Sequence, residues 1–194
     1  MKFIASLAFL FSFFLAGVKT DTCPVPPPAS NYVNHTYTGT WYEIGRIQTA
    51  GGAIFQQSCV CTELLVNTSN TTGVDLSVTN SCRDKTPQGN FINATGALVN
   101  ERTPGWYEEE FIPGLPTVNY TIIAIGDNYS VEFDCGELFG VVNYCVHILS
   151  RTPTMDPVLL AKLIFFANTT LNLNQYNLPF NTTNQTGCWS NTHQ

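Results

Sequence analysis

Short runs of strand-forming residues, repeated at an even spacing, constrain the fold of this chain more than any other feature of its sequence. Clusters of Gly, Pro and Asn separate the runs, and each run is about ten residues long. Tyr129, Val131 and Phe133 alternate with polar residues, which is the pattern of a strand with one apolar face. Eight such runs predict an all-β antiparallel barrel or sandwich, and they cover residues 41–48, 58–67, 73–82, 90–100, 105–112, 119–126, 129–135 and 143–150.

A single helix is expected after the last strand. Asp156 and Pro157 form an N-cap followed by proline at the first helical position. Apolar residues then recur at helical spacing as far as Ala167, and Lys162 is the only charge among them. The last strand hardly alternates between residues 144 and 149, which indicates cover on both of its faces. We therefore predict a helix over about 157–167 that packs on the outside of the sheet.

The N-terminal segment has the pattern of a secretory signal peptide. Lys2 is followed by an apolar run over residues 3–18, which is too short and too close to the N-terminus for a membrane span. Cleavage is expected between Gly17 and Thr20, so that residues 1–20 form the signal peptide. Residues 21–194 then form one domain, with an Asn- and Thr-rich tail over 168–194.

Secretion agrees with the cysteine content and with the density of glycosylation sequons. The chain has 7 Cys, which an oxidising compartment pairs as disulfides. Only 11% of the residues are charged, and the net charge of −6 with no basic patch excludes nucleic acid as a partner. We expect an extracellular glycoprotein with acceptor sites at Asn34, Asn67, Asn70, Asn93, Asn119, Asn128, Asn168, Asn181 and Asn184.

Two short motifs resemble the signatures of a known family. Residues 39–43 read Gly-Thr-Trp-Tyr-Glu and residues 148–153 read Ile-Leu-Ser-Arg-Thr-Pro. In this order and at this separation they resemble the first and third signature regions of the lipocalins. The chain is most similar to the apolipoprotein D group, with its insect bilin-binding protein and insecticyanin relatives, over about residues 23–188. The second signature departs, because residues 124–129 lack its Thr-Asp pair.

The resemblance implies an eight-stranded up-and-down barrel over about 39–151, with the one helix outside it. It also implies a structural pair at the closed end, in which the guanidinium of Arg151 packs across the indole of Trp41. Such a contact is a favourable cation–π interaction that seals the base of the barrel. Trp41 therefore marks the shut end, and the loops at the other end of the strands surround the mouth.

The family pattern also implies disulfides. Cys23 and Cys135 match the positions of one disulfide of the family, and Cys59 and Cys188 match the positions of the other. The hairpin that turns near residues 71–72 places Cys61 almost opposite Cys82, within disulfide reach if the strand register allows it. Cys145 is then free. A rival scheme joins Cys135 to Cys145 and leaves Cys23 free, and the sequence alone does not choose between them.

A barrel of this size encloses one small ligand. Strand parity and the resemblance predict a mostly apolar lumen with a few polar groups, which is typical of a lipophile site. We expect a secreted carrier of a fatty acid, sterol, retinoid or tetrapyrrole; the alternative is a barrel filled by its own side chains, which serves only as an interaction scaffold. The residues expected to face the lumen are Leu64, Val66, Leu76, Val78, Asn80, Ala94, Leu98, Tyr120, Ile122, Tyr129, Val131, Phe133, His147 and Leu149.

Enzymatic and metal chemistry are not expected. His147 is interpreted as a hydrogen-bonded lumen side chain or as a donor to a ligand carboxylate or carbonyl, and His35 and His193 lie in segments expected outside the barrel. No metal or cofactor is therefore predicted. Lipocalin-type prostaglandin D synthases use a barrel cysteine, but no cation except Arg83 lies near a candidate thiol here. The acidic run 108–110 is interpreted as a solvated strand face.

The mouth loops differ from the rest of the surface. Expected at residues 48–57, 83–89, 112–118 and 136–142, they contain no sequon. Exposed apolar patches often mark contact sites, so the rim is predicted to make transient contacts with membranes or lipoproteins; in the alternative the same residues fold inward as a lid. These apolar residues are Ile54, Phe55, Ile112, Leu115, Leu138, Phe139, Val141 and Val142.

Overall fold

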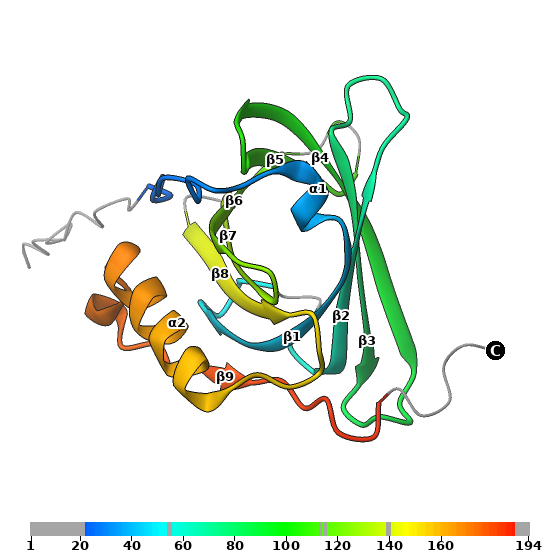
Figure 1. Ribbon diagram of the computed structural model, residues 1–194, viewed down its shortest axis with the longest axis vertical. Helices are drawn as coiled ribbons and strands as arrows, with labels where there is room; N and C mark the ends of the chain where they lie inside the picture. Colours follow the sequence, from blue (N-terminus) through cyan, green and yellow to red (C-terminus); the bar gives the residue numbers. More distant parts are fainter. Residues whose placement is uncertain (1–21, 54–55, 113, 115, 139–140, 189–194) are drawn as a thin grey trace, which may run out of the picture.

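The structure is a computed structural model that describes residues 22–53, 56–112, 114, 116–138 and 141–188. Eight antiparallel strands close into an up-and-down barrel, since each strand pairs with the next and β1 pairs with both β2 and β8. Figure 1 shows the ring of strands with one long helix outside it. The elements are α1 (Asn34–Tyr37), β1 (Gly39–Gln48), β2 (Cys59–Thr68), β3 (Leu76–Asp84), β4 (Phe91–Thr103), β5 (Trp106–Glu110), β6 (Val118–Ile125), β7 (Tyr129–Leu138), β8 (Val141–Ser150), α2 (Pro157–Thr170), the 3₁₀ helix η2 (Leu173–Tyr176) and β9 (Asn181–Thr182).

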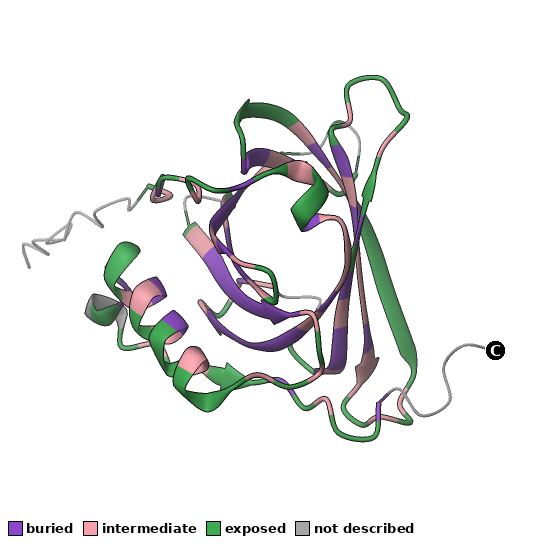
Figure 2. Ribbon diagram, viewed as in Figure 1, coloured by how far each residue is buried: buried purple, intermediate pink, exposed green. Residues whose placement is uncertain are grey.

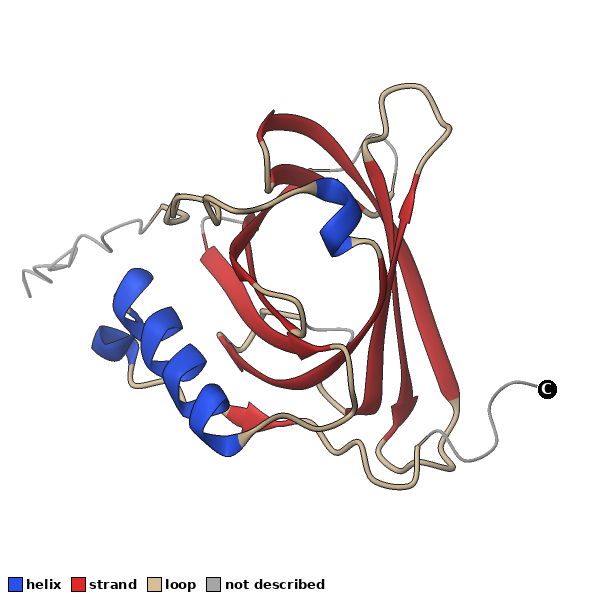
Figure 3. Cartoon of the chain, in the orientation of Figure 1, coloured by secondary structure: helices blue, strands red, loops and turns tan. Residues whose placement is uncertain are grey.

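The expected all-β barrel with a single C-terminal helix on its outside is confirmed. Each of the eight predicted runs corresponds to one strand, and the ends differ by a few residues. Helix α2 begins at Pro157 as predicted, where the Asp156 side chain accepts a hydrogen bond from the backbone N–H of Leu159 at 2.9 Å. It continues three residues beyond Ala167, to Thr170. The tail then adds a short strand, β9, to the edge of β1 (Figure 3).

Helix α2 covers the outer face of the barrel over β7 and β8. Leu163 and Ala167 of the helix share one buried cluster with Val131, Phe133 and strand β8. The prediction that Tyr129, Val131 and Phe133 face the lumen is therefore wrong: this apolar face of β7 lies under the helix. The period-two pattern reveals one apolar face but not the layer it meets, and here the helix is the more apolar neighbour.

The opposite wall of the barrel has little cover. Figure 2 shows buried residues concentrated on β1, β7 and β8, whereas much of β4 is exposed. Arg83 and Phe91 form a cation–π contact, with the guanidinium 5.2 Å from the ring centroid.

All nine sequon asparagines lie in the described residues and none of them is buried; their glycosylation stays a prediction.

Three disulfides connect the barrel to its terminal segments. Cys23 joins Cys135, the pair that the family resemblance implied. The expected Cys59–Cys188 and Cys61–Cys82 pairs are wrong, because the structure joins Cys59 to Cys82 and Cys61 to Cys188. A β-bulge between Val60 and Glu63 explains the exchange.

Cys61 sits in this bulge with φ +56°, and its N–H donates to the carbonyl of Asn184 in the tail at 2.8 Å. The extra residue reverses the side-chain alternation of the strand. Cys61 therefore meets the tail, and Cys59 faces Cys82 on the neighbouring strand β3. Cys145 is the free cysteine, as expected.

A candidate ligand site above a buried acidic floor

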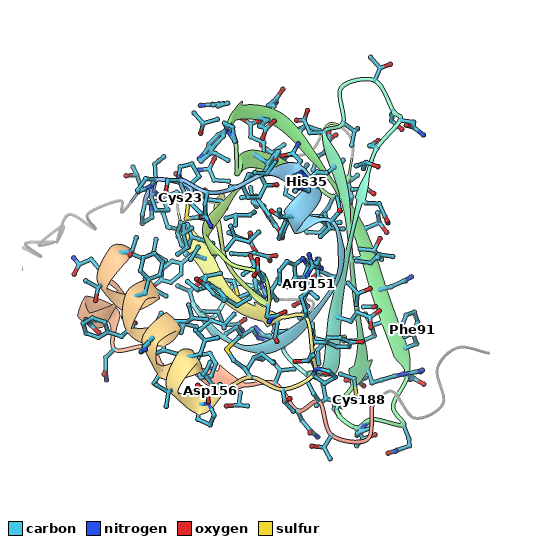
Figure 4. All side chains as sticks on the ribbon, viewed as in Figure 1. Cys23, His35, Phe91, Arg151, Asp156 and Cys188 are labelled. Atoms are coloured by element: carbon cyan, nitrogen blue, oxygen red, sulfur yellow. A yellow bond between two sulfur atoms is a disulfide. The ribbon has the colours of Figure 1, made fainter. Side chains whose placement is uncertain are left out.

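The closed half of the barrel is packed solid around Trp41. The Trp41 indole donates to the carbonyl of Tyr37 at 2.8 Å, and the Arg151 guanidinium lies 3.4 Å from the centre of the indole ring. Arg151 also donates to the carbonyls of residues 36, 38 and 40, and in Figure 4 it projects onto the centre of the ring of strands. This structural pair therefore closes the base, as the resemblance implied.

Most of the residues predicted to line the lumen are brought together in this closed half. They share one buried cluster with Trp41 and Tyr37. Because these side chains are almost fully buried, they form the packed base of the barrel rather than the wall of an open cavity. The predicted residues in this cluster are Leu64, Val66, Leu76, Val78, Leu98, Tyr120, Ile122 and Leu149.

A layer of hydroxyl and carboxyl groups lies directly above the apolar base. The Tyr37 hydroxyl contacts both the Tyr120 hydroxyl and the Glu132 carboxyl. Burial raises the pKa of both tyrosines well above their usual range. Burial also raises the pKa of Glu132 to about 8, and the neighbouring Asp134 adds to this effect. The carboxyl of Glu132 is therefore largely protonated at neutral pH.

Glu43 of β1 organises the charged part of the lumen. One of its oxygens accepts from Arg46 at 2.8 Å and also from Thr183, and the other lies 2.5 Å from Nδ1 of His147. Burial alone raises the pKa of Glu43, but the bonds from His147, Arg46 and Thr183 outweigh it and lower the pKa to about 2. Glu43 is therefore a buried, ionised carboxylate with two basic partners.

His147 of β8 faces the lumen between two carboxylates. Its Nε2 lies 3.4 Å from Oδ2 of Asp134, opposite the contact with Glu43. Burial acts to lower the pKa of His147, but its contacts with Cys145, Asp134 and Glu43 raise it well above its usual range. The prediction of a hydrogen-bonded lumen histidine places it correctly, but its partners are carboxylates of the protein itself rather than the apolar residues expected around it.

Glu109 of β5 is the most isolated acid of this layer. Only 3% of the residue is exposed, and its Oε1 has no hydrogen-bond partner among the described residues. The carboxyl lies over Gly96, where an added Cβ would come within 2.7 Å of that oxygen. Burial and the nearby Asp134 and Glu132 raise the pKa of Glu109 well above its usual range. The interpretation of residues 108–110 as a solvated face is therefore wrong for Glu109.

Five charged residues of the lumen were not predicted from the sequence. Because the apolar face of β7 packs against α2, the polar residues Glu132 and Asp134 of the same strand face the lumen. Glu43 and Arg46 lie within or next to the first family motif, and their role required knowledge of the tail residue Thr183. We call the five residues the acidic floor, although one of them is basic: Glu43, Arg46, Glu109, Glu132 and Asp134.

The barrel is open above the acidic floor. Ala94 pairs with Asn80 in the β3–β4 ladder, in phase with the inward-facing pair Leu76 and Leu98, so both point into the lumen. Ala94 is nevertheless exposed and Asn80 is half-buried. Asp134 keeps 21% of its side chain exposed, so solvent reaches the floor itself. These two predicted lining residues therefore stand on the wall of the open half.

The free thiol of Cys145 is also part of this region, where it contacts His147. It is buried in β8, and its Sγ lies 3.6 Å from Oε1 of Gln48. Burial raises the pKa of Cys145, although His147 acts in the opposite direction. A thiolate is the reactive form of cysteine, and burial favours the protonated thiol here.

The described part of the rim is apolar and exposed. Ile112 and Val141 are each 58% exposed, and Val142 is half-buried. Ile54, Phe55, Leu115 and Phe139 lie outside the described residues, as do the side chain of Leu138 and all of His193. His35 is exposed on α1, outside the packed base.

The raised pKa of Glu132 predicts a pH-dependent stability. An unfolded glutamate ionises near 4.5, whereas Glu132 in the fold ionises at about 8. Between these values the folded state binds more protons, so stability is complete below the lower value and is lost as the pH rises through the higher one. His147, whose pKa is also raised, acts in the same direction.

We therefore expect the free energy of unfolding to fall by a few kcal/mol between about pH 5 and pH 9. Urea unfolding followed by circular dichroism measures this slope, which Glu132→Gln should reduce. The exposed Glu137→Gln on the same strand serves as the control and should keep it. An unchanged slope in Glu132→Gln would refute the assignment of Glu132 as a buried neutral acid.

The fold and the lumen define a class of protein: a small antiparallel barrel with one sealed end, one open end and an external helix. The chain belongs to the lipocalin-like family, because the family model for the lipocalin-like domain matches residues 34–170.

Among the described residues, no group of His, Cys, Asp and Glu side chains is arranged to hold a metal ion. No helix in the described part of the chain has the length and apolar character needed to cross a bilayer.

Two relatives give the scale of the similarity. Apolipoprotein D of Oryctolagus cuniculus is 27% identical over 140 residues, which are 70% of this chain and 69% of that protein. The structure of insecticyanin from the tobacco hornworm Manduca sexta aligns with a TM-score of 0.62 over 84% of this chain and 86% of that one. At 17% identity, this second match shows a shared fold.

Proposed function

We propose that the protein is a secreted, glycosylated carrier that binds one small hydrophobic ligand in the open half of its barrel. The observation that carries the proposal is the contrast between the two halves of the lumen. The base is packed, whereas Ala94 and Asn80 point inward above the floor and remain accessible. A concave apolar wall with a few convergent polar groups is the usual form of a small-molecule site.

The thiol environment argues against the competing enzymatic reading. Isomerisation by a barrel cysteine requires a thiolate, and burial raises the pKa of Cys145 and so favours the protonated thiol. The other six cysteines are bonded in pairs. Binding without chemistry is therefore the function that this arrangement supports best.

Native mass spectrometry of the protein secreted by eukaryotic cells tests the proposal. The expected spectrum shows glycan heterogeneity and a further mass shift from one noncovalent ligand per chain, which organic extraction removes. Extracted protein should regain the shift when it is incubated with a lipid extract. A protein that carries no adduct and takes up none would contradict the carrier function and favour the scaffold reading.

We further propose that the apolar rim contacts lipid surfaces during ligand exchange. Ile112 follows the end of β5 and Val141 is the first residue of β8, so both lie at the mouth, and both are exposed. Burial of each side chain in a membrane contributes up to about 1.5 kcal/mol, so the double substitution Ile112→Ser and Val141→Ser should weaken binding to phosphatidylcholine vesicles by up to roughly a hundredfold. Val158→Ser, at an exposed position on α2, is the matched control and should bind like the wild type. Equal binding by all three proteins would contradict this role of the rim.

A further inference from the structure

The lumen contains more acids than bases at the level where the open half begins. Four carboxyl groups meet there, from Glu43, Glu109, Glu132 and Asp134, and two basic groups face them. Arg46 forms a salt bridge with Glu43, and His147 lies between Glu43 and Asp134. Among the described residues, Glu109 of β5 and Glu132 of β7 therefore have no basic partner within salt-bridge distance.

Two buried carboxyl oxygens on this floor lack hydrogen-bond partners in the described part of the chain. They are Oε1 of Glu109 and Oδ1 of Asp134. Buried polar atoms are normally satisfied, so an unpartnered oxygen calls for a specific explanation. Both residues are on lumen-facing positions: Asp134 pairs with the inward Tyr120, and Glu109 lies over the lumen wall at Gly96.

We propose that the ligand carries a basic group, a protonated amine, and that Glu109 and Asp134 bind this group at the floor of the open half. This inference rests on the proposed carrier function and names the chemical class of the cargo. An ammonium group has donors and no acceptor, so it matches a pair of oxygens that lack donors. The Glu109 carboxyl turns easily about its last bond, which brings either oxygen toward the ligand.

The same arrangement disfavours an anionic ligand. A fatty-acid carboxylate placed on this floor would lie close to the carboxylate of Asp134, and like charges at close range destabilise each other where water is excluded. It also carries no donor for Oε1 of Glu109 or Oδ1 of Asp134. The side chain of His147 is already occupied by Glu43 and Asp134. A hydrogen bond from His147 to a ligand carboxylate, one of the expectations from the sequence, is therefore not part of this proposal.

Amine binding is expected to release protons. The charges that act on Glu109 come from Asp134 and Glu132 of β7 and from His147 of β8, and Glu109 in turn acts on Tyr120 of β6. Burial and the two acids raise the pKa of Glu109, which favours the protonated form of its carboxyl in the free protein. A bound cation favours the ionised form, and the proton leaves to the buffer.

Titration calorimetry with three ligands of equal chain length tests the proposal: dodecylamine, dodecanol and dodecanoate. At neutral pH, the wild type should bind the amine at least about tenfold more tightly than the alcohol or the acid, as expected for one charge-assisted contact. Repeating the amine titration in phosphate and in Tris should reveal release of up to about one proton per amine.

The matched variants are Glu109→Gln and Glu110→Gln, neighbours on β5 that face opposite sides of the strand. Glu109→Gln should remove the amine preference and the proton release while it keeps alcohol binding, which shows that the barrel is intact. Glu110→Gln should bind like the wild type. Equal affinities for amine and alcohol, tighter binding of the acid, or an unchanged preference in Glu109→Gln would overturn the amine proposal alone. No binding of any of the three ligands to the wild type would overturn the carrier function as well.

Discussion

Replacing Trp41 with alanine should lower the free energy of unfolding by about 3–5 kcal/mol. Trp41 is fully buried at the centre of the closed base, where its indole bonds the carbonyl of Tyr37 and carries the guanidinium of Arg151. The substitution removes both interactions and leaves a cavity that the rigid barrel cannot fill. Urea unfolding followed by far-ultraviolet circular dichroism measures the loss without relying on tryptophan fluorescence.

A second Arg–Trp pair provides the control for this prediction. Arg102 stacks on Trp106 with its guanidinium 4.4 Å from the ring centroid, but 68% of its side chain is exposed. Arg102→Ala should therefore change stability by less than about 0.5 kcal/mol. Arg151→Ala should cost more, because it also leaves three carbonyls without their donor. A Trp41→Ala protein within about 1 kcal/mol of the wild type would contradict the assignment of Trp41 as the seal of the barrel.

Replacing Glu43 with glutamine should destabilise the protein by about 3 kcal/mol at neutral pH, although the side chain keeps its shape. The neutral amide would leave the buried Arg46 and His147 without their shared counter-charge. Chemical denaturation at neutral pH measures this loss. Glu137→Gln, an exposed acid on β7, should stay within about 0.5 kcal/mol of the wild type.

The pH dependence gives this variant its own signature. The pKa of Glu43 is lowered to about 2, so its contribution is present above the unfolded value of 4.5 and is lost as the pH falls toward the folded value. The stability difference between the wild type and Glu43→Gln should therefore shrink between about pH 5 and pH 2. A difference that stays constant over this range would show that packing rather than charge is responsible for the loss.

Local patterns sufficed for the architecture of this chain. The eight strands and the start of α2 depend on the alternation of apolar and polar residues, on turn residues and on helix capping. Each of these signals lies within a few consecutive residues. The motifs around Trp41 and Arg151 identified the sealed end in the same way. These features were predicted correctly because no distant part of the chain alters them.

The errors arose where distant segments meet. Val131 and Phe133 form an apolar face that suits the lumen and the underside of α2 equally well, and only the packed helix decides between the two. The left-handed conformation of Cys61 reverses the parity of β2, and the sequence around it contains no glycine to mark the bulge. The burial of Glu109 likewise depends on Gly96 of the neighbouring strand.

The wall of the open half offers the most direct test of the carrier function. Ala94 and Ala97 lie on the same strand, β4, but Ala94 faces the lumen and Ala97 faces outward, as their ladder partners Asn80 and Ser77 show. Tryptophan at either position adds the same bulk, so the two variants differ only in whether they narrow the lumen. Ala94 is the middle residue of the Asn93-Ala94-Thr95 sequon, and tryptophan there keeps the Asn-x-Thr pattern, whereas Ala97 lies outside every sequon.

The decisive measurement is the affinity of both variants for a neutral hydrophobic fluorescent probe. The carrier account predicts that Ala94→Trp binds the probe at least about tenfold more weakly than the wild type, a loss of about 1.4 kcal/mol, whereas Ala97→Trp binds it normally. Equal binding by Ala94→Trp, Ala97→Trp and the wild type would show that the open half of the barrel is not the ligand site.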